Sequence, residues 1–295
     1  MRSLMVSVAL LAILTVSRAE DKLQADFIKQ HLNSIGSEQA REAVKNRGVG
    51  GTVSFRIVTG GSGAQDGRQA LVSEGDRLIS FFQLPNPKYP GERFVRDGKK
   101  VHVAETAASV HSALGLFVME HSEILTEGLW GGTLSTGWPL AQMDKSLAKL
   151  EDRGLKKVDG RELHRIDYIP KKPSDLQIEL YFEPDSFRHV MTVYSLTTTP
   201  AMSRNRAENT RQLELHYRLE ESFSDFESIG NLSLPSKWTI QFNSDRPGGL
   251  TGYSGNKKAP LGNAQAAQAE IYEFDVTETS LSHNIQIDPK TFEAK

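Results

Sequence analysis

Residues 176–196 read LQIELYFEPDSFRHVMTVYSL and contain two runs in which apolar and polar residues alternate. In the first run the alternating apolar residues are Leu176, Ile178, Leu180 and Phe182. Residues 183–186 are a turn signal, Glu-Pro-Asp-Ser, and residues 187–196 form the second run. A period of two is that of a strand with one buried face. The stretch therefore predicts an antiparallel hairpin.

The same period of two recurs along most of the chain. Strands are expected at 53–57, 68–73, 77–84, 94–95, 101–103, 150–158, 162–169, 211–226, 237–242 and 270–276. Tight turns join most of them, including Asp-Gly pairs at 97–98 and 159–160. No break in composition and no repeat of 20–50 residues divides the chain. These features predict a mainly β (α+β) fold in which a single curved antiparallel sheet carries a few helices.

Three segments have a helical period instead. Residues 21–35 place their apolar side chains on one stripe, and Ser37 is suited to cap a second, short helix over 38–46. Residues 108–127, ASVHSALGLFVMEHSEILTE, predict the most amphipathic helix. The stretch that follows, GLWGGTLSTGWPL at 128–140, is rich in glycine and holds two tryptophans. It is expected to be a mobile apolar loop or hinge.

The first nineteen residues have the pattern of a secretory signal peptide. Arg2 precedes an apolar stretch at 6–16, VSVALLAILTV, and Ser17 and Ala19 are the small residues before a cut after Ala19. The apolar stretch is too short to cross ~30 Å of hydrocarbon as a helix. We therefore expect residues 1–19 to be a cleaved signal peptide and residues 20–295 to form one exported domain.

The cysteine count and the net charge exclude several classes of protein. The chain has no cysteine, so it has no disulfide, no thiol nucleophile and no cysteine at the cleavage point to take a lipid anchor. Its formal net charge is −2, which argues against a nucleic-acid partner. We expect a soluble mature protein without a lipid anchor.

Residues with catalytic potential lack the spacing that catalysis requires. Ser146 and Lys149 match S-x-x-K without its companion motifs, and no G-x-S-x-G is present. The eight histidines show no metal-binding spacing, and His111 and His121 are expected at the surface. The carboxylates of residues 220–227 are expected at a solvated strand end, although a hydrolase using carboxylates remains a weaker rival. We predict no enzyme, no catalytic residue, no metal site and no cofactor.

The apolar residues of the 108–127 helix, the tryptophan loop and the strands leave two interpretations open. They form either an ordinary core or the wall of a pocket for an apolar ligand between a curved sheet and a helical cover. The residues predicted to contact such a ligand are Phe55, Phe82, Leu114, Phe117, Val118, Leu125, Trp130 and Trp138.

The order of these features resembles that of the LolA/LolB superfamily of bacterial lipoprotein carriers. The likeness lies in residues 40–55, where a helix leads into the first strand, in residues 163–196, and in the ending HNIQIDPKTFEAK at 283–295. The resemblance implies an incomplete antiparallel β-barrel with helices in or over its concave face, closing an apolar cavity for acyl chains. It also implies an arginine that closes the lid, for which the candidates are Arg41, Arg47, Arg56 and Arg93.

The resemblance and the missing cysteine together favour the soluble-carrier branch of the superfamily. The predicted function is a periplasmic carrier or binding protein for lipoprotein acyl chains or another envelope lipid, with residues 108–127 and 128–140 as its lid. Its expected partners are the lipid, membrane-associated donor and acceptor proteins, and a membrane in transient contact, with the chain itself a monomer. The alternative is a non-enzymatic envelope scaffold or interaction protein whose own side chains fill its core.

Overall fold

The computed structural model describes residues 24–57, 63–87, 89–105, 110–143, 148–198, 215–244, 251–252 and 268–293. The expected signal peptide, residues 1–19, lies outside the described residues, as do residues 21–23 of the first expected helix. Among the described residues, no helix is both long enough and apolar enough to cross a membrane.

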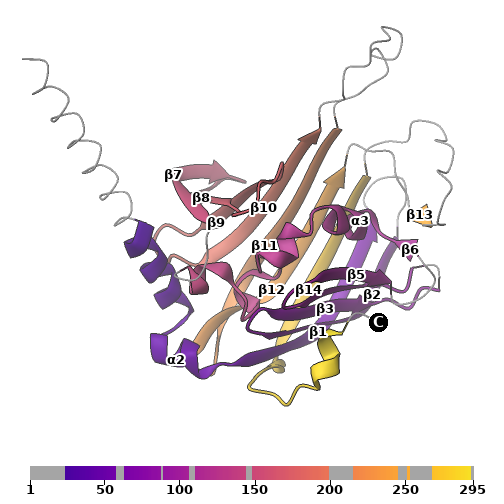
Figure 1. Ribbon diagram of the computed structural model, residues 1–295, viewed down its shortest axis with the longest axis horizontal. Helices are drawn as coiled ribbons and strands as arrows, with labels where there is room; N and C mark the ends of the chain where they lie inside the picture. Colours follow the sequence, from indigo (N-terminus) through magenta and orange to yellow (C-terminus); the bar gives the residue numbers. More distant parts are fainter. Residues whose placement is uncertain are drawn as a thin grey trace, which may run out of the picture.

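Within the described ranges, twelve antiparallel strands form one continuous sheet in the order β5-β4-β3-β2-β1-β14-β12-β11-β10-β9-β8-β7 (Figure 1). The sheet is open because β5 and β7 are its two edge strands. The predicted mainly β fold with one curved antiparallel sheet is therefore confirmed. The strands are β1 (Asn46–Ile57), β2 (Gly63–Glu74), β3 (Arg77–Gln83), β4 (Glu92–Asp97), β5 (Val101–Glu105), β7 (Lys149–Val158), β8 (Arg161–Ile169), β9 (Gln177–Phe182), β10 (His189–Thr198), β11 (Leu215–Ile229), β12 (Leu232–Ser244) and β14 (Gln268–His283).

The hairpin predicted from residues 176–196 is present as β9 and β10. Leu180 pairs with Thr192 and Phe182 with His189, so the alternating apolar residues of β9 all lie on one face. The backbone amide of Glu183 donates to the carbonyl of Arg188 at 3.0 Å and closes the turn. The Asp159-Gly160 turn between β7 and β8 is confirmed too, since both residues have positive φ, as a two-residue hairpin of this type requires.

The inner, concave face of the sheet carries the main core. On β11 and β12, for example, Phe223 pairs with Trp238 and Leu219 with Phe242, and all four side chains are buried. The outer face has two smaller apolar clusters. One of them is covered by the C-terminal segment, where Phe292 of η3 (Pro289–Phe292) packs on β3 and β4.

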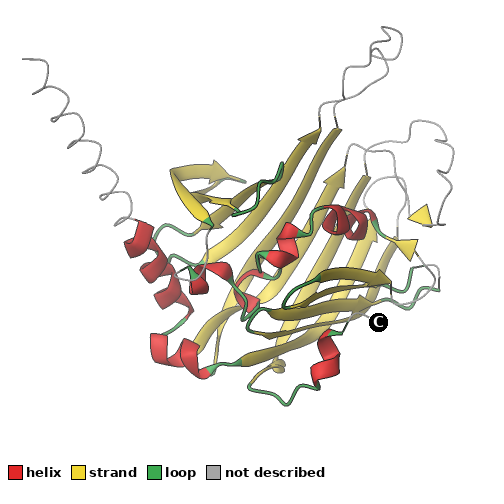
Figure 2. Cartoon of the chain, viewed as in Figure 1, coloured by secondary structure: helices red, strands yellow, loops and turns green. Residues whose placement is uncertain are grey.

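Residues 112–143, which we call the cover, lie inside the curve of the sheet (Figures 1 and 2). They contact strands from both halves of the sheet, including β4, β5, β10 and β12. The cover contains α3 (Ala113–Glu120), α4 (Glu123–Thr126), η1 (Gly132–Leu134) and η2 (Pro139–Gln142). Its apolar face is therefore in contact with the concave face of the sheet.

The single helix predicted over 108–127 is wrong in its extent. Residues 106–109 lie outside the described residues, and Val110–His111 form the short strand β6, which pairs with β13 (Thr251–Gly252). The helix begins only after Ser112, whose side chain accepts a hydrogen bond from the amide of Gly115. It ends at Glu120, because the next residue, His121, leaves the helical region with φ of −114° and ψ of 60°.

The two helices expected near the N-terminus are confirmed within the described residues. The first spans residues 24–35. The second, α2 (Glu38–Ala43), is shorter than the expected 38–46, and the Ser37 side chain caps it as predicted. Residues 44–46 leave the helix because Val44 is already extended and Asn46 begins β1.

Candidate functional site

The eight residues predicted to contact a ligand all lie in one apolar cluster between the cover and the concave face. Each is 6% exposed or less. Phe55 and Phe82 belong to strands β1 and β3, and the other six belong to the cover. Their assembly at one place agrees with a pocket wall and equally with a core, so ligand contact remains a prediction.

Aromatic rings join the cover to the sheet. The Trp130 ring of the cover lies 4.7 Å from that of Phe94 on β4 and 5.7 Å from that of Trp238 on β12. At the α3 end, the Phe117 ring lies 5.1 Å from that of Phe242 and 5.8 Å from that of Tyr217. Ring pairs at these separations attract one another beyond simple burial. The interface is therefore an aromatic layer that reaches from one half of the sheet to the other.

Glu92, a buried carboxylate on β4, holds the start of α3. Its Oε1 accepts from the amide of Ser112 at 2.9 Å and lies 3.1 Å from Nδ1 of His111. Its Oε2 accepts from the hydroxyls of Ser112 and Tyr89. Gly115 is needed here, since a Cβ at that position would lie 2.0 Å from Oε1. His111 is thus buried against the sheet and is not the surface residue expected from the sequence.

Glu221 on β11 is a second buried carboxylate that holds the cover. Its Oε2 accepts from the amide of Gly131 at 2.8 Å and from Nε1 of Trp238 at 3.0 Å, and its Oε1 accepts from the hydroxyl of Tyr194 at 2.9 Å. Burial raises the pKa of Glu221 to about 7, although these hydrogen bonds act in the opposite direction. The expectation that this residue lies at a solvated strand end is therefore wrong.

Arg47 on β1 contacts the cover. Among the hydrogen bonds of the described residues, it is the one candidate arginine of the four that does so. Its Nη1 donates to the carbonyls of Thr133 at 2.6 Å and Leu134 at 3.1 Å. Burial lowers the pKa of Arg47 to about 10, so the guanidinium remains charged at neutral pH. Arg41 instead donates to the carbonyls at the end of helix 24–35.

His31, on helix 24–35, makes a further contact with the cover. Nε1 of Trp138 donates to Nε2 of His31 at 2.9 Å, and Nδ1 of His31 lies 2.9 Å from the carbonyl of Phe187. An indole only donates, so Nε2 is the acceptor and Nδ1 carries the proton. Burial lowers the pKa of His31 to about 4 and keeps the ring neutral. Sequence reasoning missed this residue, because a histidine on a helical stripe is not distinctive.

The polar groups of the site are hydrogen-bonded to one another. Within the described part of the chain, the carboxylates of Glu92 and Glu221 each accept several hydrogen bonds. Within the same part, no group of three acidic or histidine side chains could hold a metal ion. The hydrogen bonds of these groups attach the cover to the sheet and to helix 24–35.

No family model matches the chain, and no curated protein matches it by sequence. Among solved structures it is similar to a LolA superfamily protein from Nitrosomonas europaea, with a TM-score of 0.44 and 10% identity over 92% of this chain and 97% of that one. A lipoprotein-sorting protein domain from Vibrio parahaemolyticus gives a TM-score of 0.41 at 10% identity, over 86% and 93%. A DUF1329 family protein from Desulfovibrio piger gives 0.38 at 10% identity, over 91% and 96%. The function proposed below rests on the residues of this chain.

Proposed function

We propose that this chain is an exported, periplasmic carrier or binding protein for an apolar ligand, held between the cover and the concave face of the sheet. Residues 20–295 would form its single domain. The observation that supports this function is the aromatic layer itself. It separates a cover of short helices from one continuous sheet, and the two sides are linked by polar contacts at a few separate points. A lipid acyl chain is the ligand class whose chemistry matches this layer.

Ligand entry would separate the cover from the sheet. Each buried methylene of an acyl chain contributes ~0.8 kcal/mol. A hydrogen bond to a charged group contributes about 1.5–3 kcal/mol, so releasing the contacts at Glu221 and Arg47 offsets much of that gain. The resulting affinity is modest, and a modest affinity suits a carrier that must pass its ligand from a donor to an acceptor.

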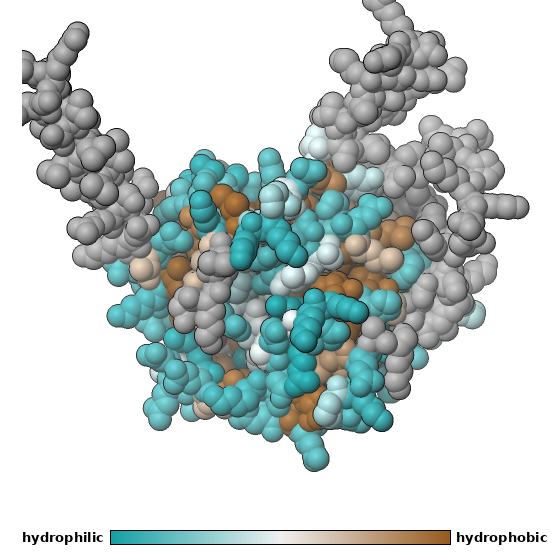
Figure 3. Space-filling view, in the orientation of Figure 1, coloured by the Kyte–Doolittle hydropathy of each residue, from teal (hydrophilic) through white to brown (hydrophobic). Residues whose placement is uncertain are grey.

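The burial of all eight candidate residues supports a second function as well as it supports the carrier. If the layer is permanently filled by its own side chains, the chain is an envelope scaffold that binds protein partners. On the face drawn in Figure 3, apolar side chains reach the surface in a patch bordered by polar residues. Met119 of α3 is 45% exposed, an exposed large apolar side chain of the cover.

Extraction of the purified protein separates the two functions. Residues 20–295 would be purified without detergent, extracted with organic solvent and analysed by mass spectrometry, and a fluorescent fatty-acid probe would be titrated into the stripped protein. Stoichiometric lipid or saturable probe binding supports the carrier. An empty extract together with no probe binding refutes it and leaves the scaffold.

A pair of substitutions on α3 tests whether the ligand binds beneath the cover. Phe117→Asp puts a charge into the aromatic layer and should abolish probe binding, because an ion is strongly disfavoured beside an acyl chain. Met119→Asp, on the exposed side of the same helix, should bind the probe as the unmodified chain does. Equal binding by both variants would show that the probe does not enter beneath the cover.

A reversible lock avoids the risk that Phe117→Asp fails to fold. The backbone amide of Thr136 in the cover donates to the Ser73 hydroxyl on β2 at 3.0 Å, so these two residues are neighbours that can be tested as a disulfide pair. Because the chain has no native cysteine, Ser73→Cys with Thr136→Cys forms one defined bond. Oxidation should slow probe uptake and reduction should restore it. Uptake that is insensitive to the bond would contradict entry beneath this part of the cover.

A further inference from the structure

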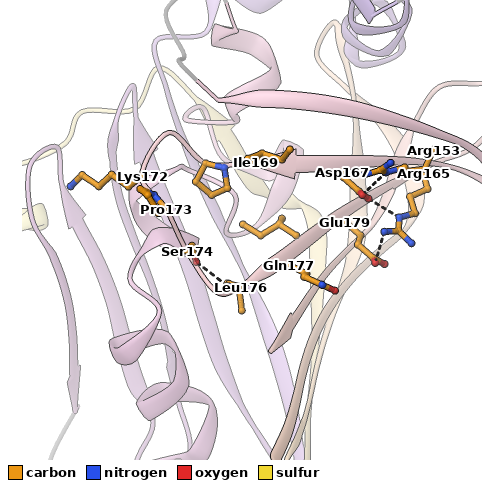
Figure 4. A pocket seen from close by; sticks show the side chains of 12 residues that line it. Arg153, Arg165, Asp167, Ile169, Lys172, Pro173, Ser174, Leu176, Gln177 and Glu179 are labelled. Atoms are coloured by element: carbon orange, nitrogen blue, oxygen red, sulfur yellow. Dashed lines mark hydrogen bonds and ion pairs between the residues drawn. The ribbon is translucent and has the colours of Figure 1, made fainter. Parts of the chain in front are cut away.

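A groove of about 530 Å³ opens on the molecule near the connection between β8 and β9 (Figure 4). It is lined by residues at the ends of these strands, by their connection and by Arg153 of β7. None of the eight residues predicted from the sequence lines it. The volume is within the range of small-molecule sites, ~300–1,000 Å³. The groove thus opens away from these eight residues, although it adjoins the cover at Ser174, whose hydroxyl donates to Glu123 of α4.

Ion pairs hold two arginines at one end of the groove, and Nη2 of Arg153 also donates to Glu151. Nε of Arg153 and Nε of Arg165 each donate to Asp167 at 2.7 Å, one to each carboxylate oxygen. Nη2 of Arg165 also lies 2.9 Å from Oε1 of Glu179. Figure 4 shows these four side chains gathered together. Among the described residues no acceptor is bonded to Nη1 of either arginine, so each guanidinium keeps N–H groups for another anion.

The remainder of the groove is largely apolar. Ile169 is 39% exposed, an unusual exposure for a large aliphatic side chain at a groove, and it lies beside Pro170. Figure 4 places Ile169 between the arginine end and the end formed by Lys172 and Pro173. Leu176 and Ile178 complete the apolar lining. The proline rings have few conformations to lose when a ligand covers them.

Among the side chains that line the groove, cations outnumber carboxylates. Arg153, Arg165 and Lys172 face Asp167 and Glu179, and Glu151, which pairs with Arg153, lies outside the lining. Burial alone would raise the pKa of Asp167, but hydrogen bonds from Arg165 and Arg153 outweigh that effect and lower it. The aspartate therefore stays ionised at neutral pH and keeps both guanidinium groups in position.

From this arrangement we infer that the groove binds an amphipathic organic anion, with its carboxylate at Arg153 and Arg165 and its apolar body along Ile169 and Pro170. The two guanidinium groups recognise the head, since they are fixed before the ligand arrives. The apolar stretch limits the body to a short chain. This site is additional to the proposed carrier site and does not depend on it.

Octanoate is a suitable probe, and methyl NMR signals locate it. Octanoate would be titrated into the full mature chain carrying methyl-labelled isoleucine. The Ile169 signal should shift with saturation, and the signal of Ile124, buried beneath the cover, reports separately on binding at the carrier site. Octylammonium has the same chain and the opposite charge, so it should leave the Ile169 signal unchanged. An Ile169 shift that does not saturate, or an equal shift with octylammonium, overturns the proposal.

Charge changes at Gln177 test the anion preference without breaking an ion pair. Gln177 is exposed and lines the groove. Gln177→Lys should tighten octanoate binding and Gln177→Glu should weaken it, each roughly two- to five-fold, as expected for exposed charges. The matched controls Gln241→Lys and Gln241→Glu, on β12, should leave the affinity unchanged. If the two Gln177 variants bind octanoate equally, the groove is not an anion site.

The outcomes of this test and of the carrier test are distinguishable. The oxidised Ser73→Cys/Thr136→Cys lock acts on the cover, so it should not change the Ile169 titration. An Ile124 shift that the lock removes reports binding beneath the cover. Loss of the Ile169 response alone rejects the groove and leaves the carrier function standing.

Discussion

Glu221 on strand β11 accepts a hydrogen bond from the backbone amide of Gly131, 90 residues earlier in the chain, at 2.8 Å. The contact joins the middle of the cover to the centre of the sheet. Both N–H donors, from Gly131 and Trp238, donate to Oε2, whereas among the described residues Oε1 accepts from the hydroxyl of Tyr194. A proton on Oε1 can therefore be donated to Tyr194 without displacing either N–H donor. This division explains how the site accepts a carboxyl group in either protonation state.

The raised pKa of Glu221 predicts that this group destabilises the fold as pH increases. Its pKa is about 7 in the folded chain against an ordinary value of 4.5, so the folded state binds the proton more tightly. The contribution of Glu221 to the free energy of unfolding is then greatest below pH 4.5. It falls by about 3 kcal/mol as pH rises through 7.

Glu221→Gln should remove this dependence and keep the contacts, since the amide NH₂ can donate to Tyr194 and the amide oxygen can accept from Gly131. Urea unfolding at pH 5, 6, 7 and 8 would measure it. The variant should gain stability relative to the unmodified chain as pH rises. Glu220→Gln, the neighbouring residue on the outer face, is the control and should not. Parallel curves for Glu221→Gln and the unmodified chain would contradict the prediction.

His31 predicts a dependence of the opposite sign. Its pKa is about 4 in the folded chain against 6.5 ordinarily, so the unfolded state binds the proton more tightly. Its contribution to stability is fully present above pH 6.5 and is lost as pH falls toward 4, by about 3 kcal/mol in total. Burial also lowers the pKa of His189, which acts in the same direction.

His31→Gln tests this expectation, because glutamine can accept from Trp138 and donate to the carbonyl of Phe187 without titrating. Its unfolding free energy should decrease less between pH 7 and pH 4.5 than that of the unmodified chain. His102→Gln, at an exposed position on β5, serves as the comparison. Should both variants lose as much stability on acidification as the unmodified chain, His31 is not the group responsible.

The strands were predictable from the sequence because one face of the sheet is buried along its whole length. That burial imposes a period of two, as in β9, where Ile178, Leu180 and Phe182 all face the core. The eight apolar candidate residues were also predictable as a group. Six of them are large apolar residues on a strand or helix whose period marks its buried face, whereas Trp130 and Trp138 stand out only as tryptophans in a glycine-rich stretch.

The polar fastenings of the cover were not predictable in the same way. The cluster of carboxylates around Glu221 is typical of a solvated strand end, although the period of two places this residue between Leu219 and Phe223 on the inner face. That position was the only available signal. Contacts such as Arg47 to Thr133 join residues 86 apart, and no local pattern encodes such a pairing. The groove at Ile169 also depends on how distant strands meet.

The two tryptophans of the cover should differ in the cost of losing their indole N–H. Nε1 of Trp138 donates to His31, whereas Nε1 of Trp130 has no partner among the described residues. Trp138→Phe leaves the buried Nε2 of His31 without its donor, but Trp130→Phe removes no hydrogen bond. Urea unfolding should show a loss larger by about 1–2 kcal/mol for Trp138→Phe. Equal losses would mean that the His31 contact contributes little to stability.

Gly115→Ala should destabilise the chain although alanine is the better helix former. In an exposed helix the change stabilises by about 1 kcal/mol. Here the new Cβ would lie 2.0 Å from Oε1 of Glu92, and contacts with Tyr89, His111 and Ser112 prevent that carboxylate from moving aside. We expect a net loss of about 2 kcal/mol or more, measured by urea unfolding.

A double variant identifies the cause of that loss. Glu92→Ala is itself costly, because it removes the acceptor of the Ser112 amide. It also removes the atom with which the new Cβ would collide. In the Glu92→Ala background, Gly115→Ala should therefore become neutral or stabilising, so the two changes are strongly non-additive. Additive losses would show that Gly115 is required for a reason other than the close approach of Glu92, and that this carboxylate does not set the position of α3.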